Sequence, residues 1–266
     1  EEIRQKVKDS FRMVDLCFGP HELWRFPELL LHTLRSGKRI FAVEDSAGNI
    51  AEGIPTVRTG KLKAWVSIMY GCNNFCSYCI VPYVRGRERS RDPECVVAEV
   101  RQLVAEGYKD ITLVGQNVNS YGKDLEIEFD FSDLLKEIDQ IEGEFRIRFM
   151  SSHPKDASFE LIDTIAKSRH VERHFHLPMQ AGSDAILSAM NRRYTSERYF
   201  SLVDYMKKQI PELSLTTDII VGFPGETEED FEKLCEFIKE AEFDRFGAFT
   251  FSAEEGTPAA ELDGQI

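Results

Sequence analysis

The chain carries an apolar run followed at once by three cysteines, AWVSIMYGCNNFCSYC, at residues 64–79. The apolar run predicts a strand, since Trp, Val, Ile and Tyr favour strands. The polar loop after it holds Cys72, Cys76 and Cys79. Three thiolates at this spacing can hold three irons of a cubane [4Fe–4S] cluster. No fourth cysteine stands nearby in the sequence, so one iron would stay open to a ligand or substrate.

Zinc is the main alternative for this loop. A structural zinc site normally needs four ligands, often as separated Cys-x-x-Cys pairs, whereas the loop has three and no nearby histidine. An odd triad in a chain of this size also disfavours a disulfide framework. We interpret the other cysteines as core residues: Cys17, Cys95 and Cys235. Reduced thiols are typical of the cytosol, so we expect a cytoplasmic protein.

The net charge of −13 argues against a surface that is basic throughout, as on many nucleic-acid-binding proteins. A local basic site is still open, because Arg85, Arg87, Arg89 and Arg91 alternate directly after the cysteine loop. Four guanidinium groups could clamp phosphates. The same run could instead be a solvated strand or loop in which Glu88 pairs with a neighbour. No apolar stretch approaches the length of a membrane span, and we expect no membrane partner.

Alternating strands and helices define the organisation of the chain. Residues 1–44 predict helix, strand, helix and strand, and the glycines and proline of 45–63 predict a linker. Over 64–266 the predicted strands are 64–70, 110–115, 145–150, 173–178, 213–221 and 246–252. The predicted helices between them are 92–107, 131–141, 158–168, 184–190, 196–209 and 227–241. About six such βα units predict an α/β fold with an open or incomplete (β/α)6 barrel rather than the closed eight.

Polar or glycine-rich loops follow the predicted strands, at the end where such folds place their chemistry. The amides of Gln116 and Asn117 offer hydrogen-bond donors and acceptors, although a hydrophilic turn would look the same. We interpret His153 as a loop histidine rather than a ligand. Small residues in 176–184 allow a ligand to approach closely, and glycines in 222–227 let the backbone face one.

Together these segments resemble the radical S-adenosylmethionine (SAM) superfamily and, within it, the methylthiotransferases. The matching stretches are 71–79, 81–83, 85–86 and 90–91. Three further stretches, 115–122, 176–183 and 218–227, resemble the branch that modifies prenylated adenosine in tRNA. The resemblance covers essentially the whole chain.

The resemblance implies the chemistry. Cys72, Cys76 and Cys79 would hold a [4Fe–4S] cluster whose open iron binds SAM. One electron then cleaves SAM to methionine and a 5′-deoxyadenosyl radical, which removes hydrogen from C2 of an N6-prenylated adenosine beside the anticodon. Sulfur is inserted there, and a second SAM supplies the methyl group. The implied partners are tRNA and an electron donor such as flavodoxin or ferredoxin.

The resemblance also assigns binding residues. Tyr78 would hold the adenine of SAM, and Gln116 and Asn117 its methionine end. Further contacts to the cofactor would come from Gln180, Gly222 and Glu226. The residues expected to contact RNA are Arg85, Arg87 and Arg91. No catalytic side chain is identified beyond the cluster.

The chain departs from the family pattern at both ends. Family members carry an N-terminal domain with three more cysteines for a second cluster, and residues 1–44 resemble only the tail of that small α/β domain. A C-terminal RNA-binding barrel, the TRAM domain, has no counterpart before residue 266. We therefore expect a fragment that binds a cluster and cleaves SAM but does not complete methylthiolation. Two alternatives stay open: a methylthiotransferase for N6-threonylcarbamoyladenosine, and a non-catalytic metal-binding RNA module.

Overall fold

We describe the chain from a computed structural model, which covers residues 2–43, 50, 52–53 and 56–265. The chain divides into two compact units, residues 1–57 and 58–266. Part of the predicted linker, namely residues 45–49, 51 and 54–55, lies outside the described residues.

Unit 1 has the predicted order of helix, strand, helix and strand. Its elements are α1 (Glu2–Ser10), β1 (Leu16–Phe18), the 3-10 helix η1 (Pro20–Arg25), α2 (Phe26–Ser36) and β2 (Ile40–Ala42). The two strands are parallel, with Cys17 opposite Phe41. The guanidinium of Arg39 donates to the carbonyl oxygens of Lys8, Phe11 and Val14, which ties the end of α1 to the strands.

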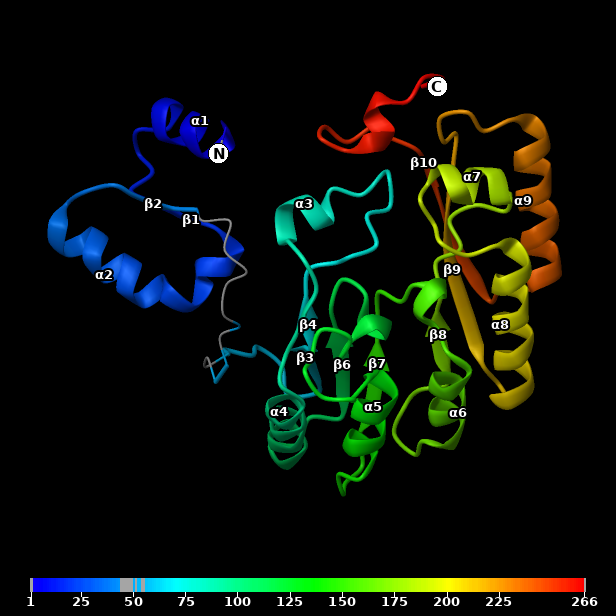
Figure 1. The fold of residues 1–266 in the computed structure, drawn as a ribbon. Helices are drawn as coiled ribbons and strands as arrows, with labels where there is room; N and C mark the ends of the chain where they lie inside the picture. The colour runs from blue at the N-terminus through cyan, green and yellow to red at the C-terminus, as the bar shows by residue number, and fades with distance from the viewer. Residues whose placement is uncertain (1, 44–49, 51, 54–55, 266) are drawn as a thin grey trace. The chain divides into compact units, whose positions relative to one another are not determined.

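Unit 2 is built on six parallel strands: β3 (Lys63–Ser67), β6 (Asp110–Val114), β7 (Arg146–Phe149), β8 (His174–His176), β9 (Ser214–Val221) and β10 (Arg245–Thr250). They form two sheets, ordered β3-β6-β7 and β8-β9-β10. A bridge between Ile147 and Val171 joins the two into one curved array (Figure 1). Among the described residues, β3 and β10 are each paired on one side only. The predicted incomplete barrel is thus confirmed.

Helices follow the strands near the predicted positions: α4 (Pro93–Ala105), α5 (Phe131–Asp139), α6 (Phe159–Lys167), α7 (Asp184–Ala189), α8 (Ser196–Gln209) and α9 (Glu228–Ala241). The residues predicted to cap the first turns of α4 and α9 do so. The carboxylate of Asp92 accepts from the backbone N–H of Cys95 and caps α4. Thr227 and Asp230 form a capping box at the start of α9.

The faces of the strands differ in polarity. Ile111 and Leu113 of β6 are fully buried in the hydrophobic core, which also contains residues of the surrounding helices. Because side chains alternate along a strand, Thr112 lies on the opposite, inner face. Polar residues continue this inner face on the neighbouring strands: Arg148, His176, Thr216 and Asp218. The inner face of the central strands β6 to β9 therefore carries mainly polar side chains, whereas Trp65 of β3 and Phe249 of β10 lie on this face of the outer strands.

The predicted strand 64–70 is wrong as a single element. Strand β3 ends at Ser67, and β4 (Met69–Tyr70) pairs antiparallel with β5 (Arg89–Ser90) outside the main sheet. The break falls at Ile68, whose N–H donates to the carbonyl of Val114 and whose carbonyl accepts from Arg91. A short helix, α3 (Val81–Arg85), was not predicted. Because β4 pairs with β5, the residues after α3, including Arg87 and Arg89, fold back beside the cysteine loop.

Candidate functional site at the cysteine loop

The three cysteines lie in a loop that leaves β4 and leads into α3 (Figure 1). Its first turn requires a glycine. Gly71 has φ of 76°, and a Cβ there would lie 2.0 Å from the carbonyl oxygen of Arg87. Cys76 is buried at 7% exposure, while Cys72 and Cys79 are half-buried. The loop therefore offers one enclosed sulfur and two more accessible ones.

Burial opposes ionisation of the free thiols. It raises the pKa of Cys72 to about 11 and also raises the pKa of Cys79. A bound metal centre reverses this, because coordination removes the proton. No three His, Cys, Asp or Glu side chains in the described part of the chain converge as they would on a single ion. A cubane does not need such convergence, since each thiolate binds a different iron.

A segment distant in sequence fixes the loop. Residues 189–192, at the end of α7, form what we call the clamp segment. The N–H of Ser77 donates to the carbonyl of Met190 at 3.0 Å, and its hydroxyl donates to Ala189 at 2.8 Å. The side-chain amide of Asn191 donates to the carbonyl of Phe75 at 2.7 Å. Phe75 has φ of 49°, an unfavourable value for an aromatic residue, which this contact helps to hold.

Arg192 completes the clamp segment. Its Nη1 lies 3.5 Å from the Sγ of Cys76, and its Nη2 donates to the carbonyl of Pro178 at 2.8 Å. Its Nε donates to the hydroxyl of Tyr194 at 3.2 Å. Arg192 is only 6% exposed. A cation is thereby held inside the protein beside one cysteine. No local pattern in the sequence indicates this contact, because residues 76 and 192 are far apart in the chain.

The amides predicted to bind SAM lie next to the loop. The Oε1 of Gln116 accepts from the N–H of Gly71 at 2.5 Å, so this side chain supports the turn before Cys72. Asn117 is 1% exposed, and its Nδ2 donates to Asp156 at 2.7 Å. Its Oδ1 has no partner among the described residues. That oxygen remains available to a ligand.

The remaining predicted cofactor contacts come from the ends of neighbouring strands. Gln180 has φ of 75° and exchanges backbone hydrogen bonds with Asp218 and Ile220 of β9. The N–H of Gly222 donates to the carboxylate of Glu226 at 2.5 Å. Burial raises the pKa of Glu226. The structure thus places the three residues at β8 and β9, whereas Tyr78 is half-buried and packs against the core.

His153 lies in the loop between β7 and the 3-10 helix η3 (Pro154–Asp156), as predicted, but its side chain is buried. It is 5% exposed, and its Nδ1 accepts from the N–H of Lys155. Burial, helped by Arg192 and two lysines, lowers its pKa to about 2. The ring is therefore neutral and carries its proton on Nε2, which has no partner in the described structure. The side-chain polar atoms of Ser152, which precedes His153, and of Asn119 also lack a partner in the described structure.

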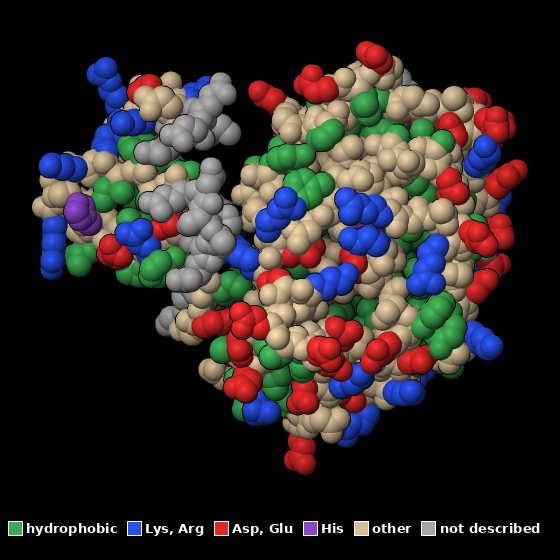
Figure 2. Space-filling model, in the orientation of Figure 1, with side chains coloured by type: hydrophobic (Ala, Val, Ile, Leu, Met, Phe, Trp, Pro, Cys, Tyr) green, Lys and Arg blue, Asp and Glu red, His purple; other side chains and the backbone are tan. Residues whose placement is uncertain are grey.

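The arginine run is divided between surface and interior. Arg85 and Arg87 are exposed, and Arg87 lies over the ring of Phe75 at 4.5 Å. Arg91 is 8% exposed and donates to the carbonyl of Ser67 and the carboxylate of Glu99. Arg91 stabilises the turn after β3, so we leave it out of the proposed RNA contact. Figure 2 shows Lys and Arg side chains near the middle of one face of unit 2, among many acidic ones.

The other three cysteines lie on regular elements: Cys17 on β1 of unit 1, and Cys95 and Cys235 on α4 and α9 of unit 2. Cys17, Cys95 and Cys235 are all half-buried, so they are not the fully enclosed core residues that we predicted. Each lies on a strand or helix that contributes only part of its surface to packing.

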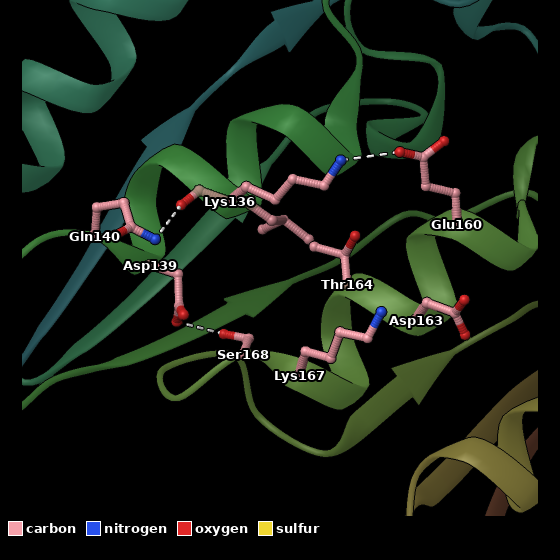
Figure 3. A pocket seen from close by; sticks show the side chains of 9 residues that line it. Lys136, Asp139, Gln140, Glu160, Asp163, Thr164, Lys167 and Ser168 are labelled. Carbon is pink, nitrogen blue, oxygen red and sulfur yellow. Dashed lines mark hydrogen bonds and ion pairs between the residues drawn. The ribbon is translucent and has the colours of Figure 1, made fainter.

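A hollow of about 540 Å³ lies between α5 and α6 (Figure 3). An ion pair between Lys136 and Glu160, 2.9 Å apart, spans its rim. Asp139 accepts from Ser168 at its other end. No residue that lines this hollow belongs to the loops at the carboxyl ends of the strands. We therefore do not assign the reaction to it.

A family model described as the radical SAM superfamily matches residues 66–238. The chain therefore belongs to the radical SAM superfamily. Among solved structures, the radical SAM methyltransferase TsrM from Kitasatospora setae aligns with a TM-score of 0.64 and 21% identity, over 81% of this chain and 40% of that one. Coproporphyrinogen III oxidase HemN from Escherichia coli aligns with a TM-score of 0.56 and 15% identity, over 77% and 48%. These likenesses confirm the fold alone.

Sequence relatives are more specific. A tRNA-2-methylthio-N(6)-dimethylallyladenosine synthase from Alkaliphilus oremlandii is 53% identical over 265 residues, which is 100% of this chain and 56% of that protein. The same-named protein from Carboxydothermus hydrogenoformans is 50% identical, over 100% of this chain and 60% of its own length. The chain thus spans little more than half of these relatives.

We also find no helix among the described residues that is long and apolar enough to cross a membrane.

Membership in the superfamily implies a [4Fe–4S] cluster and SAM, and the residues present fit both groups. The loop carries three thiols and is held in place by hydrogen bonds to the clamp segment, so it suits the cluster. The Oδ1 of Asn117 is buried without a partner and offers an acceptor to a polar ligand. The fit therefore rests on Asn117, which follows β6, as well as on the cysteine motif.

Proposed function

We propose that this chain is the radical SAM part of a tRNA methylthiotransferase that acts on C2 of an N6-prenylated adenosine beside the anticodon. The observation that carries the proposal is the clamped three-cysteine loop in a chain about half identical to synthases of that name. Dimethylallyladenosine is the modified residue in the names of these relatives, which favours it over threonylcarbamoyladenosine.

The residues of the site have distinct roles in this proposal. Cys72, Cys76 and Cys79 hold three irons, and the clamp segment keeps their loop in place. When bound, the cluster and SAM supply one-electron bond cleavage and hydrogen abstraction. Gln116 and Asn117 bind the methionine end of SAM.

The other contacts to SAM surround this centre. Tyr78 contacts the adenine, while Gln180, Gly222 and Glu226 bind the cofactor from β8 and β9. Their places at neighbouring strand ends support this assignment, because ligands in such folds bind where parallel strands end.

Partners follow from the same reasoning. Arg85 and Arg87 are exposed beside the cysteine loop and would contact the phosphates of tRNA. A small redox protein such as flavodoxin or ferredoxin would donate the electron, and the reaction would take place in the cytoplasm. The second cluster and further RNA-binding surface would belong to parts of the longer relatives that this chain does not match. The chain alone should therefore cleave SAM without completing methylthiolation.

Anaerobic reconstitution tests the proposal. We expect about four irons and four sulfides per chain, and release of 5′-deoxyadenosine from SAM under dithionite. Cys76→Ala should abolish that release, whereas the control Cys235→Ala, a half-buried cysteine on α9, should retain it. One zinc per chain with no iron would refute the proposal and favour the non-catalytic module. Methylthiolated tRNA formed by this chain alone would refute the expectation that the chain cleaves SAM without completing methylthiolation.

A further inference from the structure

Arg192 is a buried cation that has no carboxylate partner among the described residues. Among the described residues its guanidinium meets the carbonyl of Pro178, the hydroxyl and the ring of Tyr194 and the Sγ of Cys76, and no carboxylate forms an ion pair with it. A guanidinium stays protonated at any pH at which the protein is folded. Burying an uncompensated charge costs several kcal/mol. The site therefore needs an anion close to Arg192.

The sulfur of Cys76 indicates where that anion is. Its thiol is 3.5 Å from Nη1 of Arg192, and coordination to iron would make it a thiolate. A cubane held by three thiolates carries net negative charge, which grows by one unit when the cluster is reduced. The contacts to Pro178 and Tyr194 are made by Nη2 and Nε, which leaves Nη1 to face the sulfur.

We propose that Arg192 is the counter-cation of the cluster held by Cys72, Cys76 and Cys79, and that its charge raises the reduction potential of this cluster. The inference rests on the proposed function, because it requires the cluster to bind there. An attraction between a buried cation and a neighbouring anion is stronger than in water. Reduction adds negative charge beside Arg192, so the reduced state gains more than the oxidised state. Hydrogen bonds to cluster sulfurs act in the same direction.

The alternative is that Arg192 only packs. If Arg192 only packs, its contribution comes from the hydrogen bonds to Pro178 and Tyr194. A neutral side chain such as glutamine could make part of these hydrogen bonds. A role in charge compensation depends on the positive charge itself. The two roles therefore differ in what a neutral and a charged substitution do to the cluster potential.

The experiment compares three variants of the chain, each reconstituted anaerobically and titrated without SAM while the reduced cluster is followed by electron paramagnetic resonance. Arg192→Gln removes the charge, and Arg192→Lys keeps it. Arg193→Gln makes the same charge change at the exposed neighbouring residue. Omitting SAM separates an effect on the cluster from any effect on cofactor binding.

At a fixed potential we expect the ratio of reduced to oxidised cluster to fall at least tenfold in Arg192→Gln, which is a downward shift of about 59 mV for one electron. Arg192→Lys should keep most of the wild-type potential, and Arg193→Gln nearly all of it. An unchanged potential in Arg192→Gln, or an equal shift in Arg193→Gln, overturns the inference.

Loss of iron would also be informative. If Arg192→Gln holds no cluster but Arg192→Lys holds one at the wild-type potential, the requirement for charge is supported. If neither holds iron although circular dichroism shows native folding, Arg192 is structural and the inference is wrong. A wild-type chain that binds no iron–sulfur cluster would instead refute the proposed function.

Discussion

Acid should destabilise unit 2 through His153. This ring is 5% exposed, and burial is the main reason that its pKa falls from 6.5 to about 2. Arg192, Lys155 and Lys123 add positive charge around it and act in the same direction. The unfolded chain therefore binds a proton at a pH where the folded chain does not. Stability contributed by the neutral ring is present above pH 6.5 and is lost as the pH falls below it.

The magnitude follows from the two pKa values. Between pH 7.5 and 5.5 only the unfolded state protonates, so the free energy of unfolding should fall by about 1.4 kcal/mol on account of His153 alone. Below pH 5.5 each further unit should cost about the same until the pH approaches the folded pKa. Burial also lowers the pKa of His174, so part of the acid sensitivity has a second source.

Urea unfolding at pH 7.5 and 5.5, followed by circular dichroism, measures this effect. His153→Gln cannot titrate, so its free energy of unfolding should fall by about 1.4 kcal/mol less than that of the wild type over this range. The contribution of His174 is common to both proteins and cancels. His32→Gln, a substitution at an exposed residue of α2, should keep the wild-type dependence. An equal pH dependence in wild type and His153→Gln would show that the ring is not buried in its neutral form.

Two further predictions concern the backbone. Gly122→Ala would place a Cβ 1.9 Å from the carbonyl oxygen of Phe129, whereas Gly107, with the same φ of 91°, has open space around it. We expect Gly122→Ala to lower the free energy of unfolding by about 1–3 kcal/mol more than Gly107→Ala, and equal losses in urea titrations would contradict the clash. Asn191→Asp removes the N–H donor to the carbonyl of Phe75, and should cost about 1–3 kcal/mol of stability. It should also speed the loss of iron to a chelator in the reconstituted protein, and an unchanged rate would argue against the clamp.

The order of helices and strands could be predicted from the sequence because the signals are local. Alternating apolar residues mark β6, and Asp92 with Pro93 starts α4 as predicted. Each such signal depends on residues a few positions apart. The break of the first strand at Ile68 was missed, because it depends on hydrogen bonds to Val114 and Arg91.

The cysteine triad is likewise a local pattern, and the sequence by itself determined that these three sulfurs share one loop. Only the tertiary structure decided what surrounds them. Ser77 meets Ala189, and Cys76 meets Arg192, across separations of 112 and 116 residues. The parallel strands bring their carboxyl ends together, so loops that are remote in the chain come into contact there. Burial then made Arg91 structural and His153 neutral, because the free energy of a charge or a proton depends on its surroundings and not on its sequence neighbours.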